Sequence, residues 1–269
     1  MATDGPMDEQ ATQPPPRDNA DESGDETQFG FERVPTAAKT ARVKRVFDAV
    51  SPRYDLMNDL MSAGLHRLWK RFAVDLLKLR PGHVVLDLAG GTGDIARLLA
   101  QRFPGQNRVL VSDINAQMLW RGRDRALDAG LAQDLEYVQG NAEALPFASE
   151  SLDRVIMGFG LRNVTHKSAA LGEIARVLRP GGRLAVLEFS TVRTPLLARA
   201  YDFYSFQALP RLGQWVAGDG DSYRYLAESI RVHPDQEALK FMMERAGFED
   251  VRYYNLLAGI VAVHVGWKY

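Results

Sequence analysis

The sequence predicts an α/β protein with a sheet of seven strands, mostly parallel, covered by helices on both faces and closed by an antiparallel C-terminal hairpin. Three observations support this. Strand-like and helix-like segments alternate from residue 83 onward, a glycine-rich loop follows the first strand, and only a short turn separates the last two strands. Alternating strands and helices favour a parallel sheet between helix layers, whereas strands joined by a short turn pair antiparallel.

Hydrophobic periodicity divides the chain into elements. Helix-like segments are residues 43–50, 55–61, 65–79, 94–103, 116–129, 167–178, 195–216 and 234–246. Strand-like segments are residues 83–89, 108–114, 135–139, 152–159, 182–189, 251–257 and 260–267. The first three helices precede the sheet and end at the stop signal formed by Arg80, Pro81 and Gly82.

The composition excludes several classes of protein. The 269 residues are 46% hydrophobic and 25% charged, and they include no cysteine. Disulfides, thiolate nucleophiles and Cys-based zinc sites are therefore excluded. No apolar run approaches the roughly 18 residues of a membrane-spanning helix, and the acidic N-terminus is unlike a signal peptide. We therefore expect a cytoplasmic protein.

Charge is distributed unevenly along the chain. Residues 1–30 hold eight acidic side chains and one basic one, a balance of −7, so the remainder carries +6 within a net charge of −1. This segment has too few apolar residues to offset the entropy of ordering. We therefore expect a disordered acidic tail over residues 1–28 and a single domain over residues 29–269. The basic excess of the domain suits an anionic membrane surface or a nucleic acid without discriminating between them.

A glycine loop ends the first predicted strand. Gly90, Gly91 and Gly93 allow a tight turn and a close approach of the backbone to a ligand, and ligands of open α/β sheets bind outside the carboxyl ends of the strands. The spacing Gly91-x-Gly93-x-x-Ala96 also satisfies the dinucleotide fingerprint. The glycines alone therefore leave NAD and S-adenosylmethionine as alternatives.

Two acidic residues bear on the choice of cofactor. Asp87 lies just before the loop, where a carboxylate would repel a pyrophosphate but attract the ammonium and sulfonium groups of S-adenosylmethionine. Asp113 ends the second strand, 20 residues beyond Gly93, and is placed to accept hydrogen bonds from ribose hydroxyls in either cofactor. The charge of Asp87 favours the methyl donor.

Several stretches of the sequence resemble the ubiquinone/menaquinone biosynthesis C-methyltransferase family, within the class I S-adenosylmethionine-dependent methyltransferases. The stretch from Asp87 to Asp94 resembles the first class I motif, with Ala89 where the general pattern has its first glycine. Further matching stretches are residues 29–31, 54–62, 66–71, 141–147, 159–163, 178–184, 187–190, 201–206, 221–230 and 233–236. The resemblance implies a Rossmann-like fold from Phe29 to Tyr269, with an N-terminal helical lid over residues 36–80 and a substrate insertion over residues 191–233.

The expected site combines this resemblance with the strand ends. Cofactor-binding candidates are Asp87, Gly91, Thr92, Gly93, Asp113, Asn141, Ala142 and Gly158, the last replacing a frequent Ser. Catalytic candidates are Arg162, Asn163 and His233, and substrate-binding candidates are Tyr54, Asp55, Asn58, Tyr201 and Tyr204. The resemblance implies no metal and a reduced, prenylated quinol as substrate. We also expect no nucleic-acid partner, and a peripheral contact with the inner face of the membrane. A quinone-biosynthesis complex or a homodimer would be compatible with it.

The expected reaction is a single displacement, because a sulfonium methyl is already a good electrophile. The protein must align the ring carbon, the methyl carbon and the sulfur, and a general base must take a phenolic proton. His233 has a suitable intrinsic pKa, whereas Arg162 could stabilise a phenolate. Alternative functions are a methyltransferase acting on another lipid, an NAD-dependent oxidoreductase, and a nonenzymatic subunit that binds S-adenosylmethionine.

Overall fold

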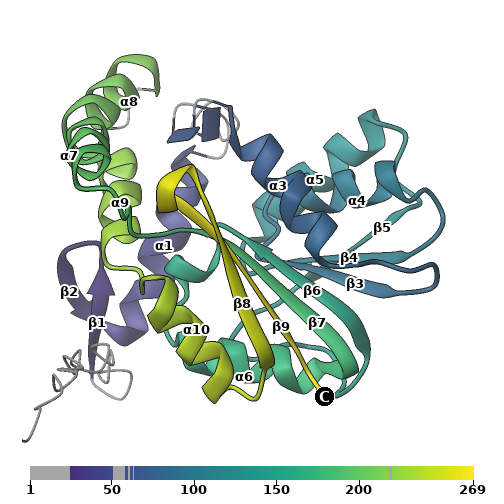
Figure 1. The fold of residues 1–269 in the computed structure, drawn as a ribbon. Coiled ribbons are helices and arrows are strands. Elements are labelled where there is room, and N and C mark those ends of the chain that lie inside the picture. The colour runs from purple at the N-terminus through teal and green to yellow at the C-terminus, as the bar shows by residue number, and fades with distance from the viewer. Residues whose placement is uncertain (1–24, 51–57, 60, 63, 218–219) are drawn as a thin grey trace, which may run out of the picture.

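The computed structural model describes residues 25–50, 58–59, 61–62, 64–217 and 220–269. Its centre is a seven-stranded sheet in the order β5-β4-β3-β6-β7-β9-β8 (Figure 1). The strands are β3 (Val84–Leu88), β4 (Arg108–Asp113), β5 (Leu135–Gln139), β6 (Leu152–Gly158), β7 (Leu178–Phe189), β8 (Glu249–Leu256) and β9 (Val261–Trp267). The predicted seven-stranded α/β sheet is confirmed.

The direction of each strand also agrees with the prediction. The pairs β3–β4, β4–β5, β3–β6 and β6–β7 are parallel, whereas β7–β9 and β8–β9 are antiparallel. The turn between β8 and β9 is a 3-10 helix, Leu257–Gly259. Because β9 lies between β7 and β8, the last strand reaches the sheet interior and β8 forms the edge.

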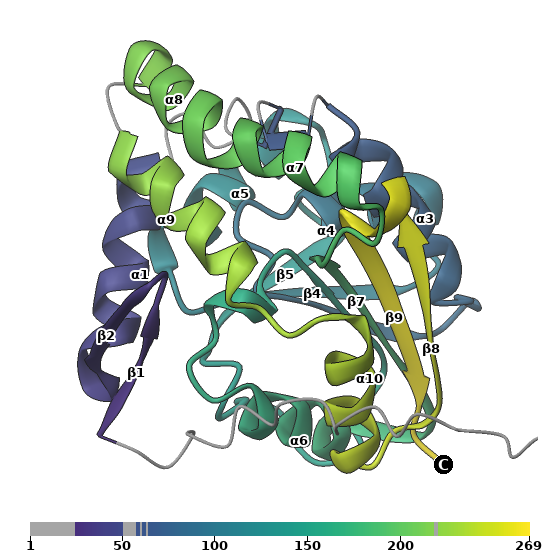
Figure 2. The same ribbon diagram turned by 60° about the vertical axis from the view of Figure 1, so that its left-hand side comes forward.

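Helices cover both faces of this sheet. One layer contains α3 (His66–Leu76), α4 (Asp94–Arg102) and α5 (Ala116–Asp128), and the other contains α6 (Lys167–Val177) and α10 (Gln236–Arg245) (Figure 2). Strand residues alternate between the two layers, as the period of a strand requires. In β3, for example, Val85 packs with the α3–α4–α5 layer whereas Leu86 packs with the α6–α10 layer. Both are fully buried, which explains why these strands are continuously apolar.

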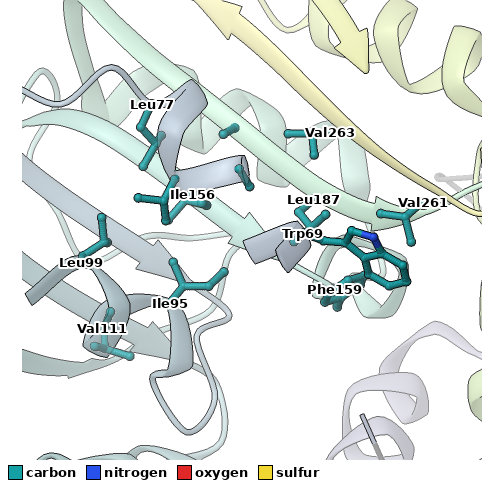
Figure 3. Packing of buried hydrophobic residues seen from close by; sticks show 14 of the residues in the cluster. Trp69, Leu77, Ile95, Leu99, Val111, Ile156, Phe159, Leu187, Val261 and Val263 are labelled. Atoms are coloured by element: carbon teal, nitrogen blue, oxygen red, sulfur yellow. The ribbon is translucent and has the colours of Figure 1, made fainter. Parts of the chain in front are cut away.

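The core between the sheet and the α3–α4–α5 layer ends in an aromatic cluster near the carboxyl ends of the central strands. Trp69 lies beside Phe159, with Leu187 and Val261 close by (Figure 3). The Phe159 ring centroid is 4.9 Å from that of Phe189 and 6.4 Å from that of Trp69. These contacts anchor α3 against the ends of β6 and β7.

The N-terminal part of the domain begins earlier than the sequence suggested. A small antiparallel hairpin, β1 (Glu26–Phe29) and β2 (Glu32–Pro35), precedes α1 (Thr36–Val50). Residues 26–28 therefore belong to a strand rather than to the expected tail. Three contacts attach the hairpin to the C-terminal half: the Phe29 ring stacks on Tyr225, the Phe31 ring stacks on Phe206, and the Phe31 N–H donates to Glu228.

Helices fill the segment between β7 and α10. They are α7 (Pro195–Phe203), the π-helical turn η3 (Tyr204–Ala208), α8 (Leu209–Ala217) and α9 (Gly220–Arg231). The helix expected over residues 195–216 is present, with the π-turn in its middle. Helix α9 was not among the predicted helices.

Candidate active site

A cavity of about 830 Å³, open solvent included, lies at the carboxyl ends of β3, β4, β5 and β6. The chain builds the sheet outward from β3 in one direction through β4 and β5, and in the other through β6 and β7. The cavity therefore occupies the switch point at which ligands of open α/β sheets bind.

The glycine loop forms one wall of this cavity. Gly91 has a left-handed backbone, with φ of +55°, and its N–H donates to the Asp113 carboxylate at 2.9 Å. A Cβ atom at Gly91 would lie 3.3 Å from the Met118 methyl group. A side chain there would be strained and would project toward another residue of the cavity wall. Glycine at this position therefore keeps the backbone open to a ligand.

Asp113 presents an oriented carboxylate to the cavity. One oxygen accepts the Gly91 N–H, and the other accepts the Asn115 N–H at 2.8 Å. Burial raises the pKa of Asp113, and these backbone hydrogen bonds oppose the rise. Each oxygen keeps further lone pairs, so the carboxylate can accept hydrogen bonds from a ligand's hydroxyl groups.

Asp87 lies beneath the loop rather than on the cavity wall. Its side chain is buried, and one carboxylate oxygen accepts the Ala96 N–H at 3.0 Å. The other oxygen has no hydrogen-bond partner in the described part of the chain. Burial raises the pKa of Asp87 to about 7, although the Ala96 N–H and the Lys70 ammonium oppose the rise. A cationic ligand above the loop would stabilise the ionised form of this carboxyl group.

Two residues next to the cavity hold uncommon backbone conformations. Ala89 and Phe159, which follow β3 and β6, have φ of +53° and +58°. Non-glycine residues with positive φ are uncommon and concentrate at functional sites. Gly160 accommodates them, because a Cβ atom there would lie only 2.6 Å from the Ala89 methyl group. The loop thus has Ala89 where the usual motif has its first glycine, and Gly160, after the neighbouring strand β6, leaves room for the Ala89 methyl group.

Helix α1, which lies within the expected lid over residues 36–80, covers the cavity, but the predicted site residues included none from this helix. Thr40, Val43, Lys44 and Phe47 line the cavity from this helix. Their spacing is that of one helical face, so the pattern was present in the sequence, but nothing in it showed what the face would cover. The Asp48 carboxylate accepts the Asn115 side-chain N–H at 2.7 Å and so ties α1 to the loop after β4.

The structure brings together only some of the predicted site residues. Five line the cavity: Gly91, Asp113, Asn141, Ala142 and Asn163. Candidates that do not line it are Asp87, Thr92, Gly93, Gly158, Arg162, His233, Asn58, Tyr201 and Tyr204. Tyr54 and Asp55 lie outside the described residues.

Two of the catalytic candidates are deeply buried. The Arg162 guanidinium donates to Glu188 at 2.7 Å and to the Phe159 carbonyl at 2.6 Å. His233 is buried as well, and neither ring nitrogen has a hydrogen-bond partner among the described residues. Burial and neighbouring cations, Lys167 and Arg162, hold the pKa of His233 well below its usual value. The geometry therefore favours a supporting role for Arg162.

Asn163 is the catalytic candidate that faces the cavity. Its side-chain oxygen accepts the Tyr225 hydroxyl at 3.1 Å. Tyr225 is buried on α9, where Phe29 stacks on its ring with centroids 4.2 Å apart. The matching stretch at residues 221–230 therefore contributes a residue that orients the Asn163 amide, a role that the sequence alone did not reveal.

Comparison with known proteins identifies the family. The model of the ubiE/COQ5 methyltransferase family matches residues 35–268. The ubiquinone/menaquinone biosynthesis C-methyltransferase UbiE of Methylococcus capsulatus is 59% identical over 243 residues, which cover 90% of this chain and 98% of the relative. This chain belongs to the ubiE/COQ5 methyltransferase family. The UbiE protein of Hahella chejuensis is 56% identical over 244 residues, covering 91% of this chain and 98% of the relative.

Solved structures of low sequence identity share the fold. A SAM-dependent methyltransferase from Thermotoga maritima superposes with a TM-score of 0.60 at 21% identity, covering 84% of this chain and all of that chain. One from Aquifex aeolicus gives a TM-score of 0.54 at 15% identity, covering 74% of this chain and 89% of that chain. This protein is an S-adenosylmethionine-dependent C-methyltransferase with the class I fold.

Replacing Gly91 tests whether the loop contacts the methyl donor. We expect Gly91→Ala to weaken binding of S-adenosylhomocysteine about tenfold or more in calorimetry, because the new methyl group narrows the cavity. Gly105→Ala is the matched control, since Gly105 also has positive φ, +64°, but has no atom within 4 Å of its Cβ position. Both variants carry a similar backbone strain of about 1 kcal/mol. Equal affinities of the two variants would contradict the assignment.

The buried Asp87 predicts a specific dependence of stability on pH. Because its folded pKa of about 7 exceeds the ordinary value of 3.8, the folded protein binds the extra proton between these pH values. The free energy of unfolding should therefore fall as pH rises from about 4 to about 7. The free energy of unfolding of the Asp87→Asn variant should not show this fall. The stability of the variant relative to wild type should therefore be at least about 1 kcal/mol greater at pH 8 than at pH 5.

Denaturant unfolding of both proteins at the two pH values measures this difference. Comparing wild type with the variant cancels other buried groups, such as His264, whose pKa burial lowers to about 4 and which acts in the opposite direction. Asp128→Asn serves as a control because Asp128 is exposed. If wild type and Asp87→Asn differed in free energy of unfolding by the same amount at both pH values, the assignment of this pH dependence to Asp87 would be ruled out.

Proposed function

We propose that this enzyme methylates a ring carbon of a prenylated quinol, 2-polyprenyl-6-methoxy-1,4-benzoquinol and/or demethylmenaquinol, in ubiquinone or menaquinone biosynthesis. The supporting observation is the pair of UbiE relatives, of which this chain covers nearly the whole length at more than half identity. The cavity agrees with this proposal, because its apolar walls suit an aromatic ring and Asp113 suits a donor that carries a ribose.

The methyl donor fits the side of the cavity formed by β3, β4 and β5. In this placement Gly91 lets the backbone approach the donor and Asp113 accepts the ribose hydroxyls. Asn141 and Ala142, which line the cavity after β5, contact the adenine. The Asp87 carboxylate supplies negative charge below the loop, and Thr92 and Gly93 shape the turn. S-adenosylmethionine supplies a methyl group that is already electrophilic, so the protein needs no nucleophile.

The acceptor ring then lies toward the β6 side. Phe159 and Gly160 line this part of the cavity together with Asn163. The Asn163 amide holds a ring hydroxyl, and Tyr225 fixes the orientation of the amide. Arg162 supports the same turn from below through its buried ion pair with Glu188. Only the reduced ring is electron-rich enough to attack the methyl group, and water or a cavity side chain takes the phenolic proton.

We place the enzyme in the cytoplasm, peripherally at the inner face of the membrane, where its acceptor would reside. Among the described residues, no helix has both the length and the apolar character to span a bilayer. A quinone-biosynthesis complex or a homodimer would be compatible with this placement. We keep the domain boundaries proposed from the sequence with one change, namely that the methyltransferase domain begins at Glu26, the start of β1, rather than at Phe29.

The reaction is tested by supplying labelled S-adenosylmethionine with short-tailed demethyl-benzoquinol or demethyl-naphthoquinol, each with and without dithionite. We expect mass spectrometry to find the methyl group on a ring carbon in the reduced samples only, because the oxidised ring is a poor nucleophile. The ring that reacts identifies the substrate class. Transfer to neither quinol, despite measurable donor binding, would refute the proposed acceptor.

The roles of Asn163 and Tyr225 predict graded losses of activity. Asn163→Ala should lower kcat/KM about a hundredfold, the order seen when a positioned hydrogen-bond donor is removed. Tyr225→Phe should lower it less, because the amide remains but loses its orientation. Asn107→Ala, at the opposite end of the sheet just before β4, is the control and should keep wild-type turnover.

Arg162→Ala is a poorer test of catalysis. It would leave Glu188 as an unpaired buried charge and destabilise the fold by about 3–5 kcal/mol. Unfolding measurements on each variant separate loss of structure from loss of turnover. Wild-type kinetics for a folded Asn163→Ala enzyme would remove Asn163 from the mechanism.

A further inference from the structure

The helical segment from α7 through η3 to α8 presents a row of side chains to solvent. The exposed members are Arg199, Phe203, Gln207, Arg211, Gln214 and Trp215, which we call the outer stripe. Most follow one another at four-residue intervals, the spacing of a single helical face. Phe203 is 67% exposed and Trp215 is 85% exposed. Two large aromatic side chains are thus held in water on one surface.

The opposite face of the same segment is packed against the domain. Ser205 and Leu209 are buried, and Gly213 lets α8 approach α9 so closely that a Cβ atom there would lie 2.4 Å from the Tyr223 ring. Figure 2 shows α7 and α8 running along the outside of the molecule, with α9 beneath them. The outer stripe is therefore the exterior of a packed layer, and its aromatics have no place in the core.

The charge of the outer stripe has one sign. Arg199 and Arg211 are its only charged members. Asp202, which lies beside the stripe on α7, is in an ion pair with Arg231 of α9. On α9 the exposed Arg224 is balanced by the exposed Asp221, so the positive charge belongs to the stripe itself. Tryptophan and phenylalanine beside arginine suit the boundary between water and an anionic bilayer, where the ring enters the headgroup region and the guanidinium meets lipid phosphate.

We propose that the outer stripe docks this enzyme onto the surface of a bilayer that contains anionic lipids. The choice of a bilayer rests on the proposed function, because a long-prenyl acceptor resides in the membrane. Docking by this face would place α7–α9 between the lipid and the cavity, where they could admit the acceptor. A second copy of this chain is a poorer occupant, because two outer stripes facing each other would bring arginines together without acidic partners.

Vesicle flotation of the full-length protein tests this surface. We expect wild type to float with vesicles that contain phosphatidylglycerol, less with phosphatidylcholine alone, and less at high salt. Phe203→Ser/Trp215→Ser and Arg199→Gln/Arg211→Gln should each weaken anionic-vesicle binding by about tenfold or more. The matched control is Trp120→Ser on α5, since Trp120 is 64% exposed but lies outside the stripe; it should bind like wild type.

Three results would overturn the proposal. The first is absence of wild-type binding to anionic vesicles, and the second is an equal loss in the Trp120→Ser control. The third is a stripe variant that dissociates a dimer in sedimentation without changing flotation, which would make the face a contact between copies. Flotation measures binding to vesicles and requires no turnover, so its result does not depend on whether the proposed reaction occurs. Stripe variants should keep wild-type methyl transfer to a short-tailed quinol in vesicle-free solution and lose it only with a long-prenyl quinol embedded in vesicles.

Discussion

The hydrogen bonds of the Asp113 carboxylate join the parts of the chain that make the site. This group accepts N–H donors from the glycine loop after β3 and from Asn115 after β4, and Asn115 in turn donates to Asp48 on α1. One partly buried carboxylate thereby sets the distance between two strand ends and the position of the helix that covers them. Removing a carboxylate from water costs free energy unless it is hydrogen-bonded. The charge of Asp113 therefore depends on the loop geometry that supplies its N–H donors, and the loop geometry depends on this carboxylate.

The same region stores unfavourable features that a ligand could relieve. One buried oxygen of Asp87 has no hydrogen-bond partner among the described residues, and Ala89 and Phe159 hold left-handed backbones. Buried charge and backbone strain persist where the surrounding structure enforces them. Here the enforcement comes from the sheet below and the aromatic cluster around Trp69. A cation bound above the loop would meet a negative, preorganised surface without further rearrangement.

The inserted helices between β7 and α10 serve two sides of the molecule. From α9, Tyr225 reaches inward to Asn163 at the cavity. From α7 and α8, Phe203 and Trp215 point outward to solvent. The insertion thus links the chemistry at the strand ends to a surface suited to lipid.

The sequence by itself determined the strand and helix alternation, the antiparallel C-terminal hairpin and the loop residues Gly91 and Asp113, because periodicity and strand-end position are local properties. Only the tertiary structure decided which residues of α1 line the cavity, that Tyr225 meets Asn163, and that Arg162 is paired with Glu188 in the interior. These facts depend on burial and on contacts between residues far apart in the chain. A sequence pattern shows which face of a helix is distinct, but the fold alone shows what that face meets.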